Sequence, residues 1–197
     1  MKILKKILIV LVVLIGIAGI CGMFMPSRLT MERSTIINAN EQIVFDQINT
    51  LKNWEKWSPW QKMDPTVKMI YNSIPSGLGA SYEWSSDNSN TGSGSLTISE
   101  SVPYSLIKIT LDFKENGIGT SDFKLAQAEG GVKLSWGFES DTDSNPFKKL
   151  MMNTLGKSFM NKTYDEGLAA IKQIAESMPA PAPETVATPV DSIATMK

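Results

Sequence analysis

The residues best suited to bind an apolar ligand are three tryptophans in one short stretch. Trp54, Trp57 and Trp60 lie three residues apart within the stretch 53–60. Flat aromatic rings make large apolar contacts, and small-molecule pockets are lined mainly by such side chains. The stretch predicts either the mouth of a hydrophobic pocket or a core cluster that fixes a loop. The core cluster is the commoner use of such residues in a small domain.

Other apolar side chains are expected to line the same cavity, or to fill a core in its place. They come from strand-like segments and from a long C-terminal helical segment, and they are Tyr82, Trp84, Phe113, Phe123, Trp136, Phe138, Met151, Leu155 and Phe159. The chain has 11 methionines, which favours a cavity that adapts its shape, because methionine is flexible.

Three carboxylates and two tyrosines could act as an acid or a base if they were buried. The carboxylates are Asp64, Glu83 and Glu100, and the tyrosines are Tyr82 and Tyr104. Burial raises the pKa of a carboxyl group toward neutrality, where it can act as a general acid or base. No second acid or base at a defined spacing accompanies them, so the sequence favours binding over catalysis.

Several classes of chemistry are excluded by residues that the chain lacks. It has no histidine, which removes imidazole bases, histidine-containing zinc sites and serine–histidine or cysteine–histidine relays. Its single cysteine, Cys21, lies in an apolar run, so thiolate catalysis and disulfides are also excluded. We expect no catalytic residue of these types, no metal site and no cofactor.

The distribution of charge argues against nucleic acid as a partner. Four of the 19 basic residues lie in the first 28 residues, where there is no acidic residue. The rest of the chain therefore carries 15 basic against 20 acidic residues, and it has no basic stripe with interleaved aromatic residues.

The N-terminal region 1–28 is predicted to be a membrane anchor. Residues 7–25 are 19 uncharged residues, close to the roughly 20 that cross a bilayer as a helix. Lys2, Lys5 and Lys6 precede this run, which places the N-terminus in the cytoplasm and the following domain on the extracytoplasmic side of a single-pass protein. A cleaved signal peptide or lipoprotein signal is the alternative, although Ile20 before Cys21 does not suit lipoprotein processing.

The domain itself is predicted to cover residues 29–178 and to be of the α+β class. A first strand over 30–37 is followed by a short helix from Glu41 and by the tryptophan stretch. Six further strands with alternating apolar and polar residues indicate an antiparallel sheet that is wetted on one face. They are expected over 67–71, 80–84, 92–101, 105–114, 120–128 and 132–139.

One long amphipathic helix from Pro146 to about Glu176 is predicted to lie across the apolar face of this sheet. Its expected inward positions include Phe147, Met151, Leu155 and Phe159. The remainder, 179–197, is rich in proline, alanine and threonine and is predicted to be a disordered tail.

This order of elements resembles the SRPBCC superfamily, also called START-like or helix-grip proteins, in its polyketide cyclase/dehydrase and lipid-transport branch. The segments that carry the resemblance are 33–39, 44–48, 53–65, 77–84 and 92–94, and it covers about residues 30–177. The resemblance implies a curved antiparallel sheet of about seven strands around a long C-terminal helix, with a hydrophobic pocket between them. It does not fix a ligand.

We therefore expect a membrane-anchored domain that binds a hydrophobic small molecule or a lipid between sheet and helix. Two alternatives stay open. One is a polyketide cyclase-like enzyme that uses a buried carboxylate or tyrosine. The other is a ligand-free envelope module that binds a protein partner, whose identity the sequence does not indicate. A cavity between helix and sheet would favour the first hypothesis over the last.

Overall fold

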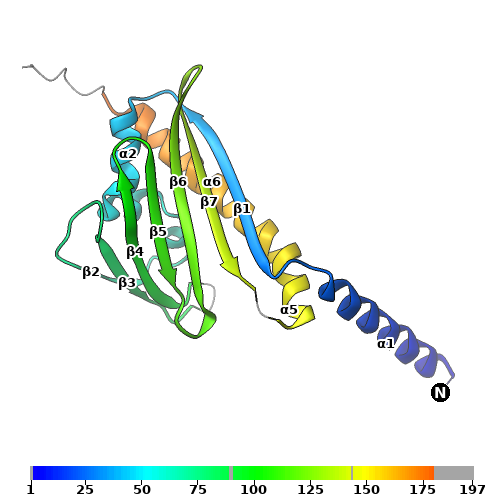
Figure 1. The fold of residues 1–197 in the computed structure, drawn as a ribbon. Helices are drawn as coiled ribbons and strands as arrows, with labels where there is room; N and C mark the ends of the chain where they lie inside the picture. Colours follow the sequence, from blue (N-terminus) through cyan, green and yellow to red (C-terminus); the bar gives the residue numbers. More distant parts are fainter. Residues whose placement is uncertain (1, 89–90, 143, 180–197) are drawn as a thin grey trace, which may run out of the picture.

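The computed structural model describes residues 2–88, 91–142 and 144–179. Seven strands form one antiparallel sheet in the order β1-β7-β6-β5-β4-β3-β2 (Figure 1). The strands are β1 Arg28–Ile37, β2 Lys68–Tyr71, β3 Ser81–Ser85, β4 Ser93–Val102, β5 Leu106–Asp112, β6 Ile118–Ala128 and β7 Gly131–Asp141. Strands β2 to β7 are therefore neighbours in chain order, and β1 joins the sheet beside β7. The expected antiparallel sheet of seven strands is confirmed.

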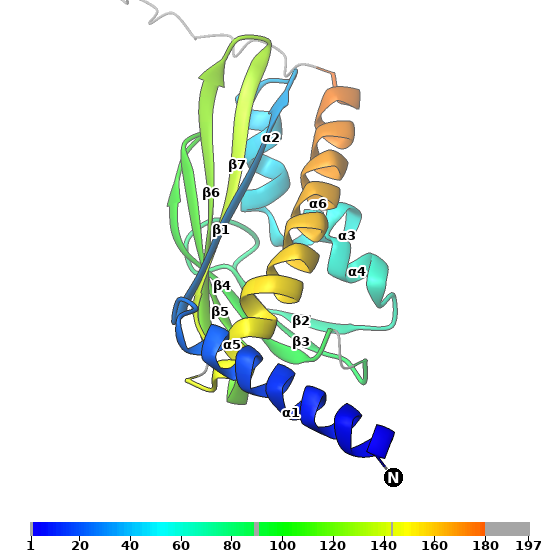
Figure 2. The ribbon, with the colours of Figure 1, turned by 90° about the vertical axis from the view of Figure 1, so that its right-hand side faces the viewer.

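Helices cover one face of this sheet. The α-helices are α1 Lys2–Met23, α2 Glu41–Asn49, α3 Trp54–Trp57, α4 Pro59–Met63, α5 Pro146–Met151 and α6 Lys157–Ser177. The described residues also form two 3-10 turns, η1 Leu51–Asn53 and η2 Lys114–Asn116, and one π-helical turn, η3 Met152–Gly156. Figure 2 shows α6 running along the sheet, with α2, α3 and α4 on the same side. The α+β helix-grip fold is confirmed.

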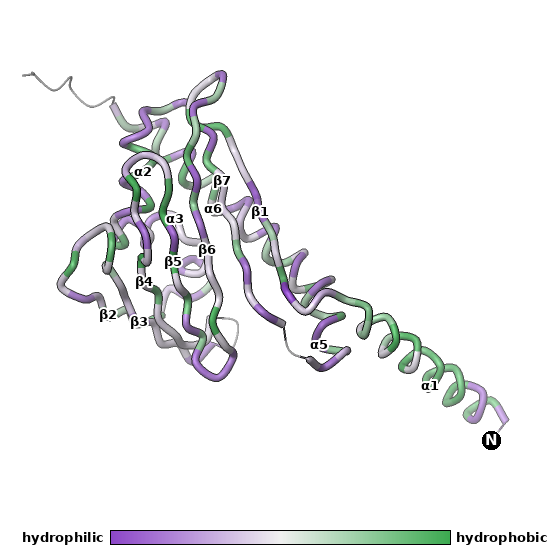
Figure 3. Tube along the Cα trace, viewed as in Figure 1, coloured by the Kyte–Doolittle hydropathy of each residue, from purple (hydrophilic) through white to green (hydrophobic). Residues whose placement is uncertain are grey.

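The strands bury one face because apolar and polar residues alternate along them. In β5, Ile107 and Ile109 are buried, whereas Lys108 between them is exposed. The inward residues of β4, β5, β6 and β7 meet those of α2, α3 and α6 in one core. In Figure 3 the strands alternate between apolar and polar residues, whereas α1 is apolar along most of its length.

Helix α6 is packed closely against the sheet from Thr163 onward. Its buried residues are Thr163, Tyr164, Gly167, Leu168, Ile171 and Ala175. A Cβ atom on Gly167 would lie 2.7 Å from the Trp136 ring, so glycine allows the helix to approach the sheet closely here. At the helix surface, Arg33 of β1 donates two hydrogen bonds to the carboxylate of Asp165, at 2.7 and 2.8 Å.

The N-terminal part of the long helical segment is arranged differently from our expectation. Neither α5 nor η3 contains a buried residue. Met151, Leu155 and Phe159 are 52%, 73% and 48% exposed, so the expected inward positions are corrected to outward ones, and Phe147 is 48% exposed as well. The inward positions are Met152 and Met160, which pack against the core. The predicted positions recur every four residues and form a separate stripe on the same segment.

The apolar helix α1 stands outside the domain core and contacts it at α5. It is 22 residues long and has the length and composition of a membrane-spanning helix, which a signal sequence also has. Its C-terminal end packs on α5, since a Cβ atom on Gly19 would lie 3.3 Å from the Phe147 ring. The expected tail at 179–197 lies outside the described residues except for Pro179.

Candidate functional site

The tryptophan stretch caps the C-terminal end of α2. The indole N–H of Trp54 donates to the carbonyl oxygen of Ile48 at 2.8 Å, and that of Trp57 donates to Gln47 at 2.9 Å. The side-chain amide of Asn53 donates to the carbonyl oxygen of Asp46 at 2.9 Å. Carbonyl groups in the last turn of a helix have no partner within the helix, so these bonds satisfy them.

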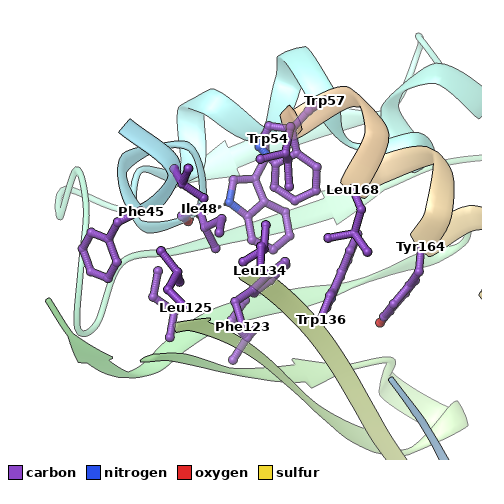
Figure 4. Packing of buried hydrophobic residues seen from close by; sticks show 14 of the residues in the cluster. Phe45, Ile48, Trp54, Trp57, Phe123, Leu125, Leu134, Trp136, Tyr164 and Leu168 are labelled. Atoms are coloured by element: carbon purple, nitrogen blue, oxygen red, sulfur yellow. Dashed lines mark hydrogen bonds between the residues drawn. The ribbon is translucent and has the colours of Figure 1, made fainter. Parts of the chain in front are cut away.

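The same tryptophans belong to a buried aromatic stack between the sheet and α6 (Figure 4). Phe123 of β6 stacks on Trp136 of β7 with ring centroids 4.8 Å apart, and Trp136 stacks on Tyr164 of α6 at 3.8 Å. Trp57 meets Trp136 edge to face at 5.6 Å. Four of the sequence-predicted site residues are therefore core residues: Trp54, Trp57, Phe123 and Trp136.

A buried serine satisfies the polar atoms of this stack. The indole N–H of Trp136 donates to Oγ of Ser121 at 2.9 Å, and that hydroxyl donates to the carbonyl oxygen of Gly137 at 2.7 Å. Burial raises the pKa of the Tyr164 hydroxyl well above its usual range, so this phenol stays protonated at neutral pH. The stack is thus a satisfied, neutral element of the core.

Around this core some apolar side chains are less deeply buried. Seven of the half-buried side chains that pack against the core are called the apolar rim: Trp60, Met69, Trp84, Leu111, Phe113, Met152 and Met160. They come from α4, β2, β3, the end of β5, η3 and the first turn of α6. Of the sequence-predicted site residues, Trp60, Trp84 and Phe113 lie in the rim, and buried Tyr82 and Phe138 adjoin it.

Two glycines let the aromatic rings of this region lie close to the sheet. A Cβ atom on Gly94 would lie 2.6 Å from the Trp84 ring. A Cβ atom on Gly119 would lie 2.8 Å from the Phe138 ring and 3.2 Å from the Phe113 ring. Trp84 and Phe113 also meet edge to face, with ring centroids 5.9 Å apart. The result is a continuous aromatic surface on the inner face of β3 to β7.

Two depressions in the described part of the chain are lined mainly by polar residues. One, of about 210 Å³, is lined by Glu83, Gly94, Ser95, Asp112 and Lys114. The other, of about 60 Å³, is lined by Thr66, Lys68, Ser85, Ser86 and Asp87. Neither depression is lined by a residue of α6, whose buried side chains pack against those of the sheet in the core.

The carboxylates considered for catalysis do not face this interior. Asp64 is buried in a loop, where it accepts hydrogen bonds from Thr66 and from the Ser86 hydroxyl. These bonds hold the pKa of Asp64 below its usual value, the reverse of what a general acid needs. Glu83 is exposed, and Glu100 pairs with Lys108 at 2.6 Å.

The two tyrosines considered for catalysis differ in their surroundings. Tyr82 is buried, which raises the pKa of its hydroxyl far above neutrality, and Tyr104 is exposed. Among the described residues, no group of three or more acidic, cysteine or histidine side chains could hold a metal ion.

Several residues of this region were not predicted from the sequence. Met69 lies opposite Trp84 in the β2–β3 pair, a register that only the paired strands reveal. Met152 and Met160 belong to the inward face of the helical segment, eight residues apart, a spacing that fits one helix face. Tyr164 continues that face four residues further on and could have been found from the same periodicity.

The fold and the aromatic interior together define a helix-grip domain of the SRPBCC type. Residues 28–176 match the family model described as "Polyketide cyclase / dehydrase and lipid transport". The chain belongs to this family. No curated protein matches the chain.

Solved structures of the same fold have low sequence identity to this chain. Protein CV1439 from Chromobacterium violaceum has 16% identity and a TM-score of 0.53, covering 75% of this chain and 98% of its own. The Aha1 dimer from Colwellia psychrerythraea has 13% identity and a TM-score of 0.55, covering 76% and 97%. The di-domain ARO/CYC BexL from the BE-7585A biosynthetic pathway has 12% identity and a TM-score of 0.58, covering 78% of this chain and 52% of its own. At these identities the likeness shows the fold.

Proposed function

We propose that this protein is a membrane-anchored domain that binds an apolar small molecule or a lipid between the β2–β5 part of the sheet and the segment formed by α5, η3 and the start of α6. The observation that carries the proposal is the apolar rim, where seven large apolar side chains remain half-buried beside a closed core. Half-buried aromatic and methionine side chains in one place are typical of surfaces that accept apolar ligands.

The segment above the rim is suited to open. The described side chains of α5 and η3 are not buried, whereas the following helix is fixed by six buried residues and by the Arg33–Asp165 pair. A π turn within a helix often marks a functional position. Met152 and Met160 are half-buried and pack against the core, so they are the side chains of this segment that would move if it opened.

Membrane anchoring through α1 supports the same function. Its 22 residues suit a bilayer span, and the lysines at positions 2, 5 and 6 favour a cytoplasmic N-terminus with the domain on the extracytoplasmic side. A domain held beside a bilayer is exposed to a high local concentration of lipophilic molecules, which favours occupancy at modest affinity.

The test is native mass spectrometry of the full chain, purified from its own host in mild detergent. We expect an additional mass that organic extraction removes. Trp84→Ala should reduce its occupancy, because Trp84 lies in the rim. The matched control is Ile70→Ala on the neighbouring strand, where the side chain is 71% exposed, and it should keep the additional mass. Absence of the additional mass from the natural chain and from both variants would refute ligand binding.

The filled interior favours a second function, a packed module that binds a protein partner. In that case the additional mass is absent, and chemical cross-linking in intact cells joins the domain to another envelope protein. The two functions thus give opposite results in the same preparation.

A further inference from the structure

The outward face of α5, η3 and the start of α6 carries an apolar stripe that the function proposed above does not use. Phe147, Met151, Leu155 and Phe159 are spaced by four residues, and each is about half exposed or more. Residues spaced in this way lie on one face of a helix. Large apolar side chains gathered on an exposed face of a domain mark a contact with a membrane or a partner.

The charges beside this stripe favour an anionic surface as its partner. Residues 146–164 contain four lysines and no acidic residue, although the domain as a whole has more acidic than basic residues. Lys157 is exposed, and Lys162 is exposed beside Glu166 at 3.9 Å. A helix with an apolar stripe and flanking lysines is the pattern of segments that lie in the interface of a bilayer with anionic lipids.

The contact between α1 and α5 fixes the position of the stripe relative to a spanning helix. Phe147, the first residue of the stripe, packs on Gly19 of α1. Gly19 precedes the last residue of α1, Met23, by four residues, or about 6 Å along the helix axis. If α1 spans the bilayer, Phe147 therefore lies at the depth of about 5–10 Å that interfacial helices reach. Figures 1 and 2 show α1 leaving the domain beside α5.

We infer that this stripe lies in the headgroup region of the membrane that α1 spans, so that the segment covering the apolar rim is in direct contact with lipid. The inference rests on the anchoring part of the proposed function. The inferred membrane contact gives the ligand a route to its proposed site, since a lipid could pass from the bilayer beneath the helical segment and onto the rim without crossing water.

The experiment uses the full chain in vesicles of equimolar phosphatidylcholine and phosphatidylglycerol, with bimane attached to one cysteine at a time. The native Cys21 is the only cysteine and reports on α1 itself. In a Cys21→Ser background, Leu155→Cys reports on the stripe and Lys133→Cys on the far end of β7. Phosphatidylcholine with a nitroxide on its headgroup should quench the label at position 155 severalfold more than the label at 133. Lys157→Glu should weaken this quenching in the anionic vesicles but not in vesicles of phosphatidylcholine alone.

Each contrary outcome has a separate meaning. A label at 155 that stays in water while the Cys21 label is quenched by lipid overturns the inference and leaves the anchor intact. If the labels at Cys21 and at position 155 both stay in water, the anchor is refuted and with it the inference. A change in the environment of the label at 155 that disappears when the protein is diluted in lipid means that a second copy covers the stripe, which also overturns it.

Discussion

The indole N–H of Trp57 donates a 2.9 Å hydrogen bond to the main-chain carbonyl oxygen of Gln47, inside the core. Gln47 lies in the last turn of α2, and the Trp57 ring has no exposed surface. Water therefore cannot replace this donor. The tryptophan stretch fixes where α2 ends, and through its rings it joins that helix to β6, β7 and α6.

Replacing Trp57 by phenylalanine should destabilise the protein beyond the loss of ring volume. The carbonyl oxygen of Gln47 would remain buried without a partner, which costs about 1–3 kcal/mol. We expect this loss in the free energy of unfolding measured in urea with the full chain in detergent. Trp60→Phe is the control, because Trp60 is half-buried and no indole hydrogen bond of this kind is found for it in the described structure. Equal losses for the two variants would show that the hydrogen bond is unimportant.

The stack of Tyr164 on Trp136 should contribute strongly to stability. Tyr164→Ala removes a buried ring and leaves a cavity, at a cost of about 3–5 kcal/mol. Tyr164→Phe keeps the ring over Trp136 and should cost much less. Tryptophan fluorescence during unfolding measures both variants. If Tyr164→Phe were as damaging as Tyr164→Ala, the hydroxyl group and not the stack would carry the contribution.

Gly167→Ala should be destabilising even though alanine favours helix. The new methyl group would lie 2.7 Å from the Trp136 ring and 3.3 Å from the Pro59 ring, both on the side of the core. Overpacking of this kind costs about 1–3 kcal/mol. Gly156→Ala is the matched control in the same helical segment, since its methyl group would meet the flexible Met152 side chain at 3.3 Å and the Met151 carbonyl oxygen at an ordinary contact distance of 3.7 Å. That variant should gain up to about 1 kcal/mol from helix propensity. Thermal unfolding of the two variants should therefore shift in opposite directions.

Asp64 should make stability depend on pH below its ordinary pKa of 3.8. Hydrogen bonds from Ser86 and Thr66 stabilise the carboxylate and lower the pKa of Asp64 in the folded protein. A lowered folded pKa means that the contribution is complete above pH 3.8 and is lost as the pH falls through the lower, folded value. Asp64→Ala should be less stable than the natural chain at pH 7, and the gap should narrow on acidification. A gap that stays constant down to acid unfolding would contradict this assignment.

The sheet could be predicted closely because each strand carries a strong local signal. The alternation through Ile107, Lys108 and Ile109 marks β5, and the other strands follow the same rule. The start of α2 also has a local cause, since the Asn40 side chain accepts a hydrogen bond from the N–H of Gln42 at 2.8 Å. Strand existence and helix starts depend on neighbouring residues, which a sequence displays directly.

The site was harder to predict because burial depends on residues far apart in the chain. Trp57 and Trp60 are the same residue type three positions apart, yet Trp57 is buried and Trp60 is half-buried. Both rings meet Trp136 edge to face, so the difference depends on further contacts that the spacing does not display. In the helical segment Met152 packs against the core, whereas its neighbour Met151 and Leu155 are exposed, and the residue types alone do not distinguish the two stripes. Whether rim residues bind a ligand stays a prediction.

The pairing of β1 with β7 has a consequence for biosynthesis. Arg28 at the start of β1 pairs with Asp141 at the end of β7. The first strand to be synthesised can therefore pair only after the last strand has been synthesised. Strands β2 to β7 can form hairpin by hairpin meanwhile, but contacts so distant in the chain form slowly. Because α6 packs along β1 and follows β7, the grip closes only after translation has passed residue 177. Until β7 has been synthesised, β1 has no partner in the sheet, and an unpaired strand of this kind exposes the nascent chain to aggregation.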